Sequence, residues 1–158
     1  MYEPLIFFRL SGRLHRYGQD SLDLCSTISL MGSTISPGVQ VSAETSYQQE
    51  YSAPLNHEFM FVYRITIKNN NAFPIRLLSR HWHIFEGNGI YREVEGEGVV
   101  GAQPLIGAGK QYQYVSGCNL KTEMGKMHGY YIVENMDTRQ KFSVPIPAFE
   151  LIAPLKLN

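Results

Sequence analysis

The amino-acid sequence predicts an all-β protein, an immunoglobulin-like β-sandwich of about seven or more short strands. Tyrosine (10) and phenylalanine (8) are abundant among the 158 residues, together with Val, Ile and Thr, and strands favour these residue types. Segments that alternate apolar and polar residues recur at near-regular spacing, with turn residues between them. No window shows the sustained apolar period of about 3.6 residues that an amphipathic helix requires.

The alternation begins with the segment 39–47, in which apolar and polar residues alternate as in a half-buried strand. Residues 59–67 predict the strongest strand, apolar on both faces at first and amphipathic later. The Asn-rich turn 69–74 separates it from a third strand at 75–86. Trp82 falls in this third strand, where immunoglobulin-like sandwiches often bury a tryptophan, so we expect it to point inward.

Two further strands follow the same rules. Gly87-Asn-Gly89 is typical of a hairpin turn and leads into a strand over 90–95. Gly107-Ala-Gly109 then precedes an alternating segment at 111–116, which predicts the next strand.

A second hairpin is expected near the C-terminus. Strands over 127–134 and 141–151 are joined by the turn 135–139. Pro145 and Pro147 have no backbone N–H to donate to a neighbouring strand. The last strand is therefore predicted at a sheet edge.

The first thirty residues differ from the rest because they lack sustained alternation. We therefore place the β-sandwich domain at 31–158 and regard 1–30 as an N-terminal extension. Our interpretation is that the start is over-called, so that residues 1–30 precede the true first residue of the protein. The alternative is an extra edge segment that packs Leu5, Phe7 and Leu10 on the domain. Deletion of 1–30 is expected to leave a folded domain.

Composition excludes several classes of protein. Lys and Arg (14) balance Asp and Glu (14), so no basic field attracts nucleic acid or an anionic membrane. Cys25 and Cys118 have no paired spacing, which excludes a metal knuckle and suits a reducing cytosol. No segment is long and apolar enough to cross a bilayer. We expect a cytoplasmic protein.

Gly96-Glu-Gly-Val-Val-Gly101 fits the pattern G-x-G-x-x-G of dinucleotide-binding loops. Such a loop must follow a strand and open a helix whose N-terminus holds the pyrophosphate. Here Pro104 follows and helical periodicity is missing, which argues against dinucleotide binding. Two interpretations remain: a loop whose glycines take positive φ or allow close approach, and a nest of free backbone amides for an anion.

His81 and His83 lie two apart on one predicted strand, so both side chains point to the same face. Two such imidazoles can chelate a divalent transition metal if His128 or a Glu adds a third ligand. Two ligands alone make a weak site, and ordinary hydrogen-bonded histidines are the alternative. The sequence therefore predicts no cofactor, with His81 and His83 as weak metal candidates.

No catalytic constellation stands out. Glu93, Glu95 and Glu97 share a parity, which is more typical of a solvated strand face than of paired catalytic carboxylates. Ser116-Gly-Cys118 lacks the strand–turn–helix context of a nucleophile elbow, so Cys118 is expected to be a packing residue. The sequence predicts a protein that is not an enzyme.

Several motifs together resemble one known family over about residues 35–152: Leu77-Leu-Ser-Arg-His-Trp82, Gly96-Glu-Gly-Val-Val-Gly-Ala-Gln-Pro104, Tyr114-Val-Ser-Gly117, Gly125-Lys-Met-His-Gly-Tyr130 and Ile146-Pro-Ala-Phe149. The resemblance is to the ApaG family. That family's loop usually has Pro where this chain has Glu97, and commonly has an apolar residue where His83 stands.

The resemblance implies a fibronectin type III-like or immunoglobulin-like sandwich for residues 31–158. Bacterial ApaG proteins are linked genetically to cobalt resistance and magnesium efflux, and similar domains in eukaryotes look like interaction modules. A sandwich without a membrane span cannot itself move ions, so any such role is indirect. We expect a non-enzymatic binding or interaction module. The alternatives are a nucleotide- or phosphate-binding or hydrolysing protein that uses loop 96–101, and a direct divalent-metal sensor.

The functional surface is expected where loop 96–104 meets the end of the neighbouring strand. The candidate ligand-binding residues are Arg80, His81, Gly96, Gly98, Gly101 and Gln103. Arg charge and free amides suit a small anionic or peptide ligand, or a protein partner. The alternative is that Arg80 and Gln103 simply hold the loop in place. The oligomeric state is open, with a dimer as one option.

Overall fold

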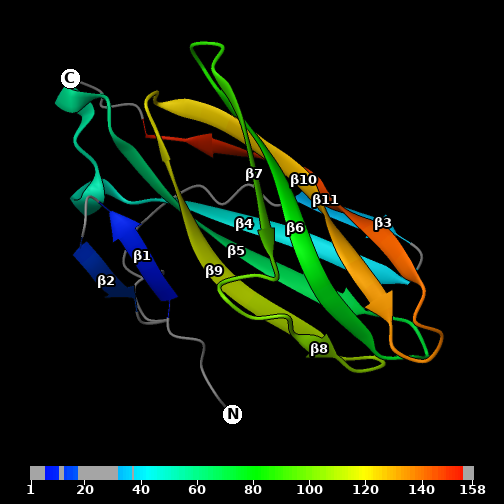
Figure 1. The fold of residues 1–158 in the computed structure, drawn as a ribbon. Helices are drawn as coiled ribbons and strands as arrows, with labels where there is room; N and C mark the ends of the chain where they lie inside the picture. The colour runs from blue at the N-terminus through cyan, green and yellow to red at the C-terminus, as the bar shows by residue number, and fades with distance from the viewer. Residues whose placement is uncertain (1–5, 11–12, 18–31, 37, 155–158) are drawn as a thin grey trace.

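Two antiparallel β-sheets pack face to face in the computed structural model, which describes residues 6–10, 13–17, 32–36 and 38–154 (Figure 1). In this part of the chain there is no α-helix, and the helical turns are two short 3-10 segments, Gln49–Tyr51 and Pro54–Asn56. None of the helices described is long and apolar enough to span a membrane. The all-β, fibronectin-like sandwich predicted from the sequence is confirmed.

The first sheet has the strand order β3-β4-β5-β9. Its strands are β3 (Gly32–Ser36), β4 (Val39–Tyr47), β5 (Phe59–Asn69) and β9 (Gln111–Leu120). Along β4 buried and partly exposed residues alternate strictly, which is the pattern of one face packed on a core. The early part of β5 is buried on both faces, as its apolar run predicted.

The second sheet has the order β11-β10-β6-β7, and β8 also pairs with β6. Its strands are β6 (Ile75–Glu86), β7 (Tyr91–Glu97), β8 (Leu105–Ile106), β10 (Met124–Asn135) and β11 (Lys141–Ile152). The predicted hairpin at 87–89 joins β6 to β7. The proline-containing strand β11 lies at the sheet edge, as expected.

Near the N-terminus, β1 (Ile6–Leu10) and β2 (Arg13–Tyr17) form a separate antiparallel pair. Leu5 and residues 18–31 lie outside the described residues. The boundary proposed at residue 31 and the status of 1–30 as an extension therefore stay predictions.

The core between the sheets includes Trp82, which is 2% exposed and is the largest fully buried side chain of the described residues. Its ring packs edge-on against Tyr63 of β5, at a centroid distance of 5.5 Å, and against Phe149 of β11 at 5.8 Å. A buried hydrogen bond of 2.5 Å between the hydroxyls of Tyr114 and Tyr131 also joins β9 to β10 across the core. The inward orientation predicted for Trp82 is confirmed.

The two sheets do not close on one side of the sandwich. β7 is the last strand of one sheet and β9 is the last strand of the other, and no ladder joins them (Figure 1). Side chains from both strands therefore face each other across an inter-sheet opening, which holds the candidate site described next.

Candidate functional site

The glycine loop after β7 is closed by its own hydrogen bonds. The N–H of Gly98 donates to the carbonyl of Leu78 at 2.8 Å, and Val99 and Ala102 exchange backbone hydrogen bonds of 2.8 and 3.0 Å. Gly98 and Gly101 take positive φ, and a Cβ on Gly98 would lie 2.0 Å from the carbonyl oxygen of Ala102. Of the two interpretations, glycines at positive φ with close approach describe Gly98, whereas its amide is not free for an anion because it is already used within the turn.

Arg80 and Gln103 also hold this loop. Nη1 of Arg80 donates to the carbonyls of residues 97 and 98, at 3.2 and 2.8 Å. Nε2 of Gln103 donates to the carbonyl of Leu78 at 2.9 Å. A Cβ on Gly96 would lie 2.9 Å from Arg80 Nη1, so glycine at this position leaves room for the guanidinium. The geometry matches the interpretation that Arg80 and Gln103 pin the loop.

The context of a dinucleotide-binding loop is missing. The loop leads into the two-residue strand β8, and no helix follows it within residues 98–154. The pyrophosphate of a dinucleotide would therefore meet no helix N-terminus here.

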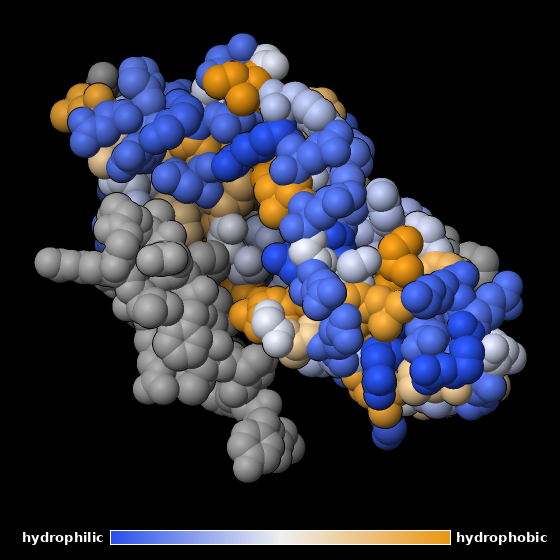
Figure 2. All heavy atoms as spheres, viewed as in Figure 1, coloured by the Kyte–Doolittle hydropathy of each residue, from blue (hydrophilic) through white to orange (hydrophobic). Residues whose placement is uncertain are grey.

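A cleft of about 220 Å³ opens between β7 and β9, and Figure 2 shows the surface hollowed near the centre of this face. Its polar lining comes from Arg80, Arg92, Ser116 and Asn119; its apolar lining includes Tyr63, Trp82, Ile84, Val94 and Met127. Of the residues predicted from the sequence, Arg80 lines this cleft. Gly96 lies near the end of β7, opposite Arg80 of β6. Gly98, Gly101 and Gln103 belong to the pinned loop, and His81 lies on the opposite face of β6.

Arg92 of β7 is the cleft residue that sequence reasoning missed. Its Nη2 donates to the carbonyl of Asn119 on β9 at 2.5 Å, so its side chain bridges the open edge. Its Nε lies 3.8 Å from Glu86 Oε1, which is an ion-pair distance but too long for a hydrogen bond. The sequence could have indicated this position of Arg92. Side chains two residues apart on a strand point to the same face, so Arg92 points with Val94 and away from the exposed Glu93.

Three polar atoms of the cleft residues are buried and lack a hydrogen-bond partner among the described residues. They are Nε1 of Trp82, Nε of Arg92 and Oδ1 of Asn119. An unpaired buried donor or acceptor costs about 1–3 kcal/mol, and native proteins rarely leave several together. Residues of the cleft wall therefore hold two buried donors and one buried acceptor whose hydrogen bonds the described chain does not supply.

The thiol of Cys118 lines the same cleft but is poorly suited to act as a nucleophile. Burial raises its pKa to about 11, although the nearby Arg92 charge acts in the opposite direction. The thiol is therefore protonated near neutral pH, and the thiolate is the nucleophilic form. Cys118 is buried, as expected for a packing residue.

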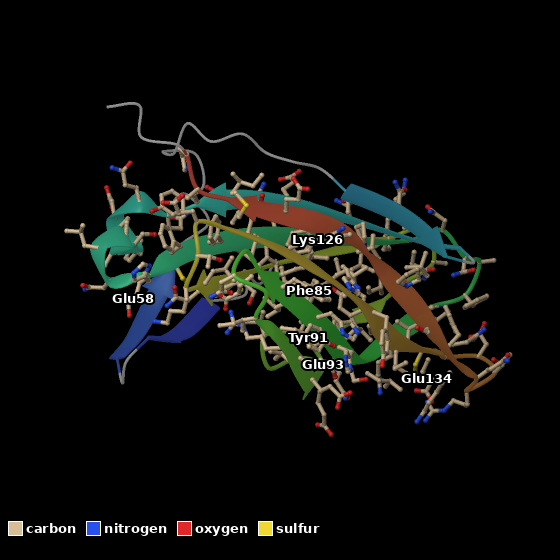
Figure 3. All side chains as sticks on the ribbon, turned by 90° about the horizontal axis from the view of Figure 1, so that it is seen from above. Glu58, Phe85, Tyr91, Glu93, Lys126 and Glu134 are labelled. Carbon is tan, nitrogen blue, oxygen red and sulfur yellow. The ribbon has the colours of Figure 1, made fainter. Side chains whose placement is uncertain are left out.

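On the opposite face of β6 the side chains of β7, β6 and β10 form regular rows. Figure 3 shows one row, Tyr91, Phe85 and Lys126, with Glu93 next to Tyr91. His83 lies in the next row between Glu93 and His128. The prediction that His81 and His83 share a face is confirmed, since their rings lie 4.6 Å apart on the outer surface.

Glu93 contacts both histidines. Its Oε2 lies 3.3 Å from Nε2 of His81, and its Oε1 lies 3.7 Å from Nδ1 of His83. It also accepts a hydrogen bond from the hydroxyl of Tyr91, which lowers the pKa of Glu93 and raises the pKa of Tyr91 to about 12. Glu93, Glu95 and Glu97 are not the purely solvated ladder expected, because the first two pair with His81.

Comparisons with known proteins bear on the family and the fold. The family model described as the ApaG domain matches residues 49–135. The chain is 44% identical over 124 residues to Protein ApaG of Escherichia coli K12 and of Shigella boydii, covering 78% of this chain and 98% of each relative.

A crystal structure of an ApaA protein from Bordetella pertussis is also similar. It has a TM-score of 0.71 and 39% sequence identity, over 73% of this chain and 94% of that one. The described fold, the family match and the identity to curated relatives lead to one conclusion. The chain belongs to the ApaG family.

Proposed function

We propose that this protein is a non-enzymatic binding module whose site is the cleft between β7 and β9. The ligand would be an oxyanion attached to a short apolar group, carried by a protein partner or by a small molecule. One observation carries the proposal: the unpartnered atoms of Trp82, Arg92 and Asn119 belong to residues that line one cleft.

The charge of the cleft favours an anion. Arg80 donates only to backbone carbonyls and has no carboxylate within ion-pair distance among the described residues. Arg92 has one carboxylate nearby, Glu86, which also accepts a hydrogen bond from the backbone of Lys121. Guanidinium groups match the geometry of carboxylate and phosphate oxygens.

The remaining lining specifies the rest of the ligand. Ile84, Val94 and Met127 present apolar surface that suits a small aliphatic or aromatic group. Oδ1 of Asn119 is an unpaired acceptor, so a ligand with one N–H or O–H donor would satisfy it. A peptide end with a free carboxylate has all three features.

Two features support a binding role over catalysis. The residues that line the cleft include no His, Asp or Glu that could act as a general base. The raised pKa of Cys118 disfavours a thiolate nucleophile. The closed hydrogen bonds of loop 96–101 likewise give less support to the nucleotide or phosphate alternative at that loop. The role in cobalt and magnesium homeostasis that the family resemblance implies would then be indirect, through whatever the cleft binds.

Calorimetry with a matched pair of probes tests this proposal. N-acetyl-leucine offers a carboxylate, an amide N–H and an isobutyl group, whereas N-acetyl-leucinamide differs by the loss of the charge. We expect saturable binding of the acid and binding at least about tenfold weaker, or none, for the amide, because a charged hydrogen bond contributes about 1.5–3 kcal/mol. Phenyl phosphate serves as the second arm and distinguishes a phosphate from a carboxylate ligand.

The variant Arg92→Gln should weaken binding of the acid by at least about tenfold. Arg64→Gln is the matched control, because Arg64 pairs with Glu44 on β4 and does not line the cleft. Equal affinities for the acid and the amide, or equal losses in both Arg variants, would contradict the proposal.

A further inference from the structure

A second group of side chains, on the opposite face of β6 from the cleft, has the composition of a metal-binding site. One ring nitrogen each of His81 and His83 and one carboxylate oxygen of Glu93 all lie within 4.8 Å of one another. The two histidines come from β6, and the register of β6 with β7 places Glu93 directly opposite His83. The strand pairing therefore supplies the third ligand that the two histidines alone lack.

The contacts of His81 fix which of its nitrogens is free. Its Nδ1 contacts a carboxylate oxygen of Glu95, so Nδ1 carries the hydrogen and donates it. Its Nε2 then holds a lone pair, is buried, and has no hydrogen-bond partner among the described residues. This carboxylate–histidine arrangement is the one that orients imidazoles toward metals in known sites.

A carboxylate oxygen lies beside the free nitrogen of His81. Oε2 of Glu93 is 3.3 Å from His81 Nε2 but off the direction of a hydrogen bond, so two groups that can each donate an electron pair to a cation lie side by side without bonding each other. A metal cation can bind to both. The proximity of His83, whose Nδ1 lies 3.7 Å from Glu93 Oε1, favours a cation that takes several ligands.

Neighbouring rings hold the two histidines in place. Tyr130 stacks on His81 at a centroid distance of 5.0 Å and an interplanar angle of 7°. His128 stacks on His83 at 4.8 Å and 22°. These contacts limit ring rotation, which favours binding because less side-chain entropy is lost when the ligands are fixed.

We propose that His81, His83 and Glu93 bind one divalent transition-metal cation of the zinc class. Two imidazoles and one carboxylate suit Zn²⁺ and its neighbours, whereas Mg²⁺ and Ca²⁺ prefer all-oxygen sites. Bonds of about 2.0–2.1 Å in tetrahedral geometry separate ligand atoms by about 3.3 Å, so those ligand atoms that now lie up to 4.8 Å apart move closer together on binding.

Tyr91 is the group that the cation would displace from His83. Its hydroxyl lies 2.6 Å from Nδ1 of His83 and donates a hydrogen bond to Glu93. Because the Tyr91 hydrogen goes to Glu93, Nδ1 of His83 donates in the first contact, so coordination by Nδ1 requires its proton to move to Nε2 and leaves the Tyr91–Glu93 hydrogen bond in place. With three protein ligands, the cation keeps at least one coordination position for water or another ligand.

Calorimetric titration of the full, tag-free chain with Zn²⁺ at neutral pH tests the proposal. We expect one equivalent to bind, and Glu93→Gln and His83→Ala each to weaken binding by at least about tenfold. Glu95→Gln should weaken it by about 10–100-fold, because it removes the partner that orients His81. The side-chain NMR signals of His81 and His83 should shift on saturation.

His57→Asn is the matched control, since His57 lies in the 3-10 segment region away from this face and Asn tolerates its positive φ of 53°. Glu93 is half-exposed, so Glu93→Gln should fold normally, and an unchanged unfolding midpoint without metal checks this. Lack of binding up to about 1 mM Zn²⁺, or binding unaffected by both Glu93→Gln and His83→Ala, would overturn the site. An equal loss in His57→Asn would overturn it as well.

Discussion

The hydrogen bond between Tyr114 and Tyr131 gives the sharpest test of how the two sheets are held together. Both hydroxyls are buried in the core, and their oxygens lie 2.5 Å apart. Burial raises the pKa of both side chains, so both hydroxyls are neutral at ordinary pH. The perturbation is the removal of one hydroxyl or of both, in Tyr114→Phe, Tyr131→Phe and the double variant.

The expected magnitude follows from the asymmetry of buried hydrogen bonds. Each single variant leaves the other hydroxyl buried and unpaired, which costs about 1–3 kcal/mol. The double variant removes both polar groups, so no unpaired hydroxyl remains and the total cost falls well below the sum of the singles. A coupling free energy of about 1–2 kcal/mol is expected, in the usual range for groups in contact.

Urea unfolding of the four proteins, followed by circular dichroism, measures this coupling in a double-mutant cycle. In separate thermal unfolding, each single variant should have a midpoint temperature lower by about 2–12 °C, given about 2–4 °C per kcal/mol for a domain of this size. Strictly additive single and double variants would refute the reasoning, because they would show that the two hydroxyls do not interact.

Four further predictions follow from the structure. Trp82→Ala should cost about 3–5 kcal/mol, because it truncates the largest fully buried side chain among the described residues; a loss below about 1 kcal/mol by urea unfolding, or water-like fluorescence of Trp82, would contradict its burial. Gly129→Ala should lower the unfolding midpoint and disturb the β6–β10 ladder, because the added Cβ would lie 2.0 Å from the carbonyl oxygen of His81; an unchanged midpoint would show that the strands are further apart. Stability should fall as pH rises from about 10 to about 12, because burial raises the pKa of Tyr63 to about 12 in the folded state, while the unfolded state releases this proton near pH 10. That shift alone corresponds to about 2–3 kcal/mol, and a flat pH profile in Tyr63→Phe and in the unchanged protein alike would argue against it. Deletion of residues 1–30 should leave a folded domain, and a midpoint lower by more than about 5 °C would show that this segment packs on it.

The sequence predicted the features that depend on the alternation of side chains along a single strand. Alternation of apolar and polar residues along 39–47 and 75–86 located β4 and β6, and it oriented Trp82 inward and His81 and His83 outward. Pro145 and Pro147 predicted that β11 lies at a sheet edge for an equally local reason, because proline has no backbone N–H to donate. These inferences needed no knowledge of which strands become neighbours.

The cleft could not be predicted in the same way, because it depends on contacts between distant parts of the chain. Arg92 and Asn119 come together only because β7 and β9 are the free edges of two different sheets. The role of the glycine loop was likewise decided by Leu78, whose carbonyl accepts hydrogen bonds from Gly98 and Gln103. Glu93 lies next to His83 because of the register of the β6–β7 hairpin. The alternation of side chains along each strand does not determine that register.

The indole N–H of Trp82 provides the most direct measurement on the cleft. Trp82 is the only tryptophan in the chain, so its indole signal in a ¹H–¹⁵N NMR spectrum is assigned without ambiguity. Its Nε1 is one of the unpartnered donors on which the proposed oxyanion site depends. During titration with N-acetyl-leucine this signal should move saturably, and with N-acetyl-leucinamide it should stay nearly fixed. An indole signal that does not move while N-acetyl-leucine binds elsewhere, or that moves equally with both compounds, would contradict the site.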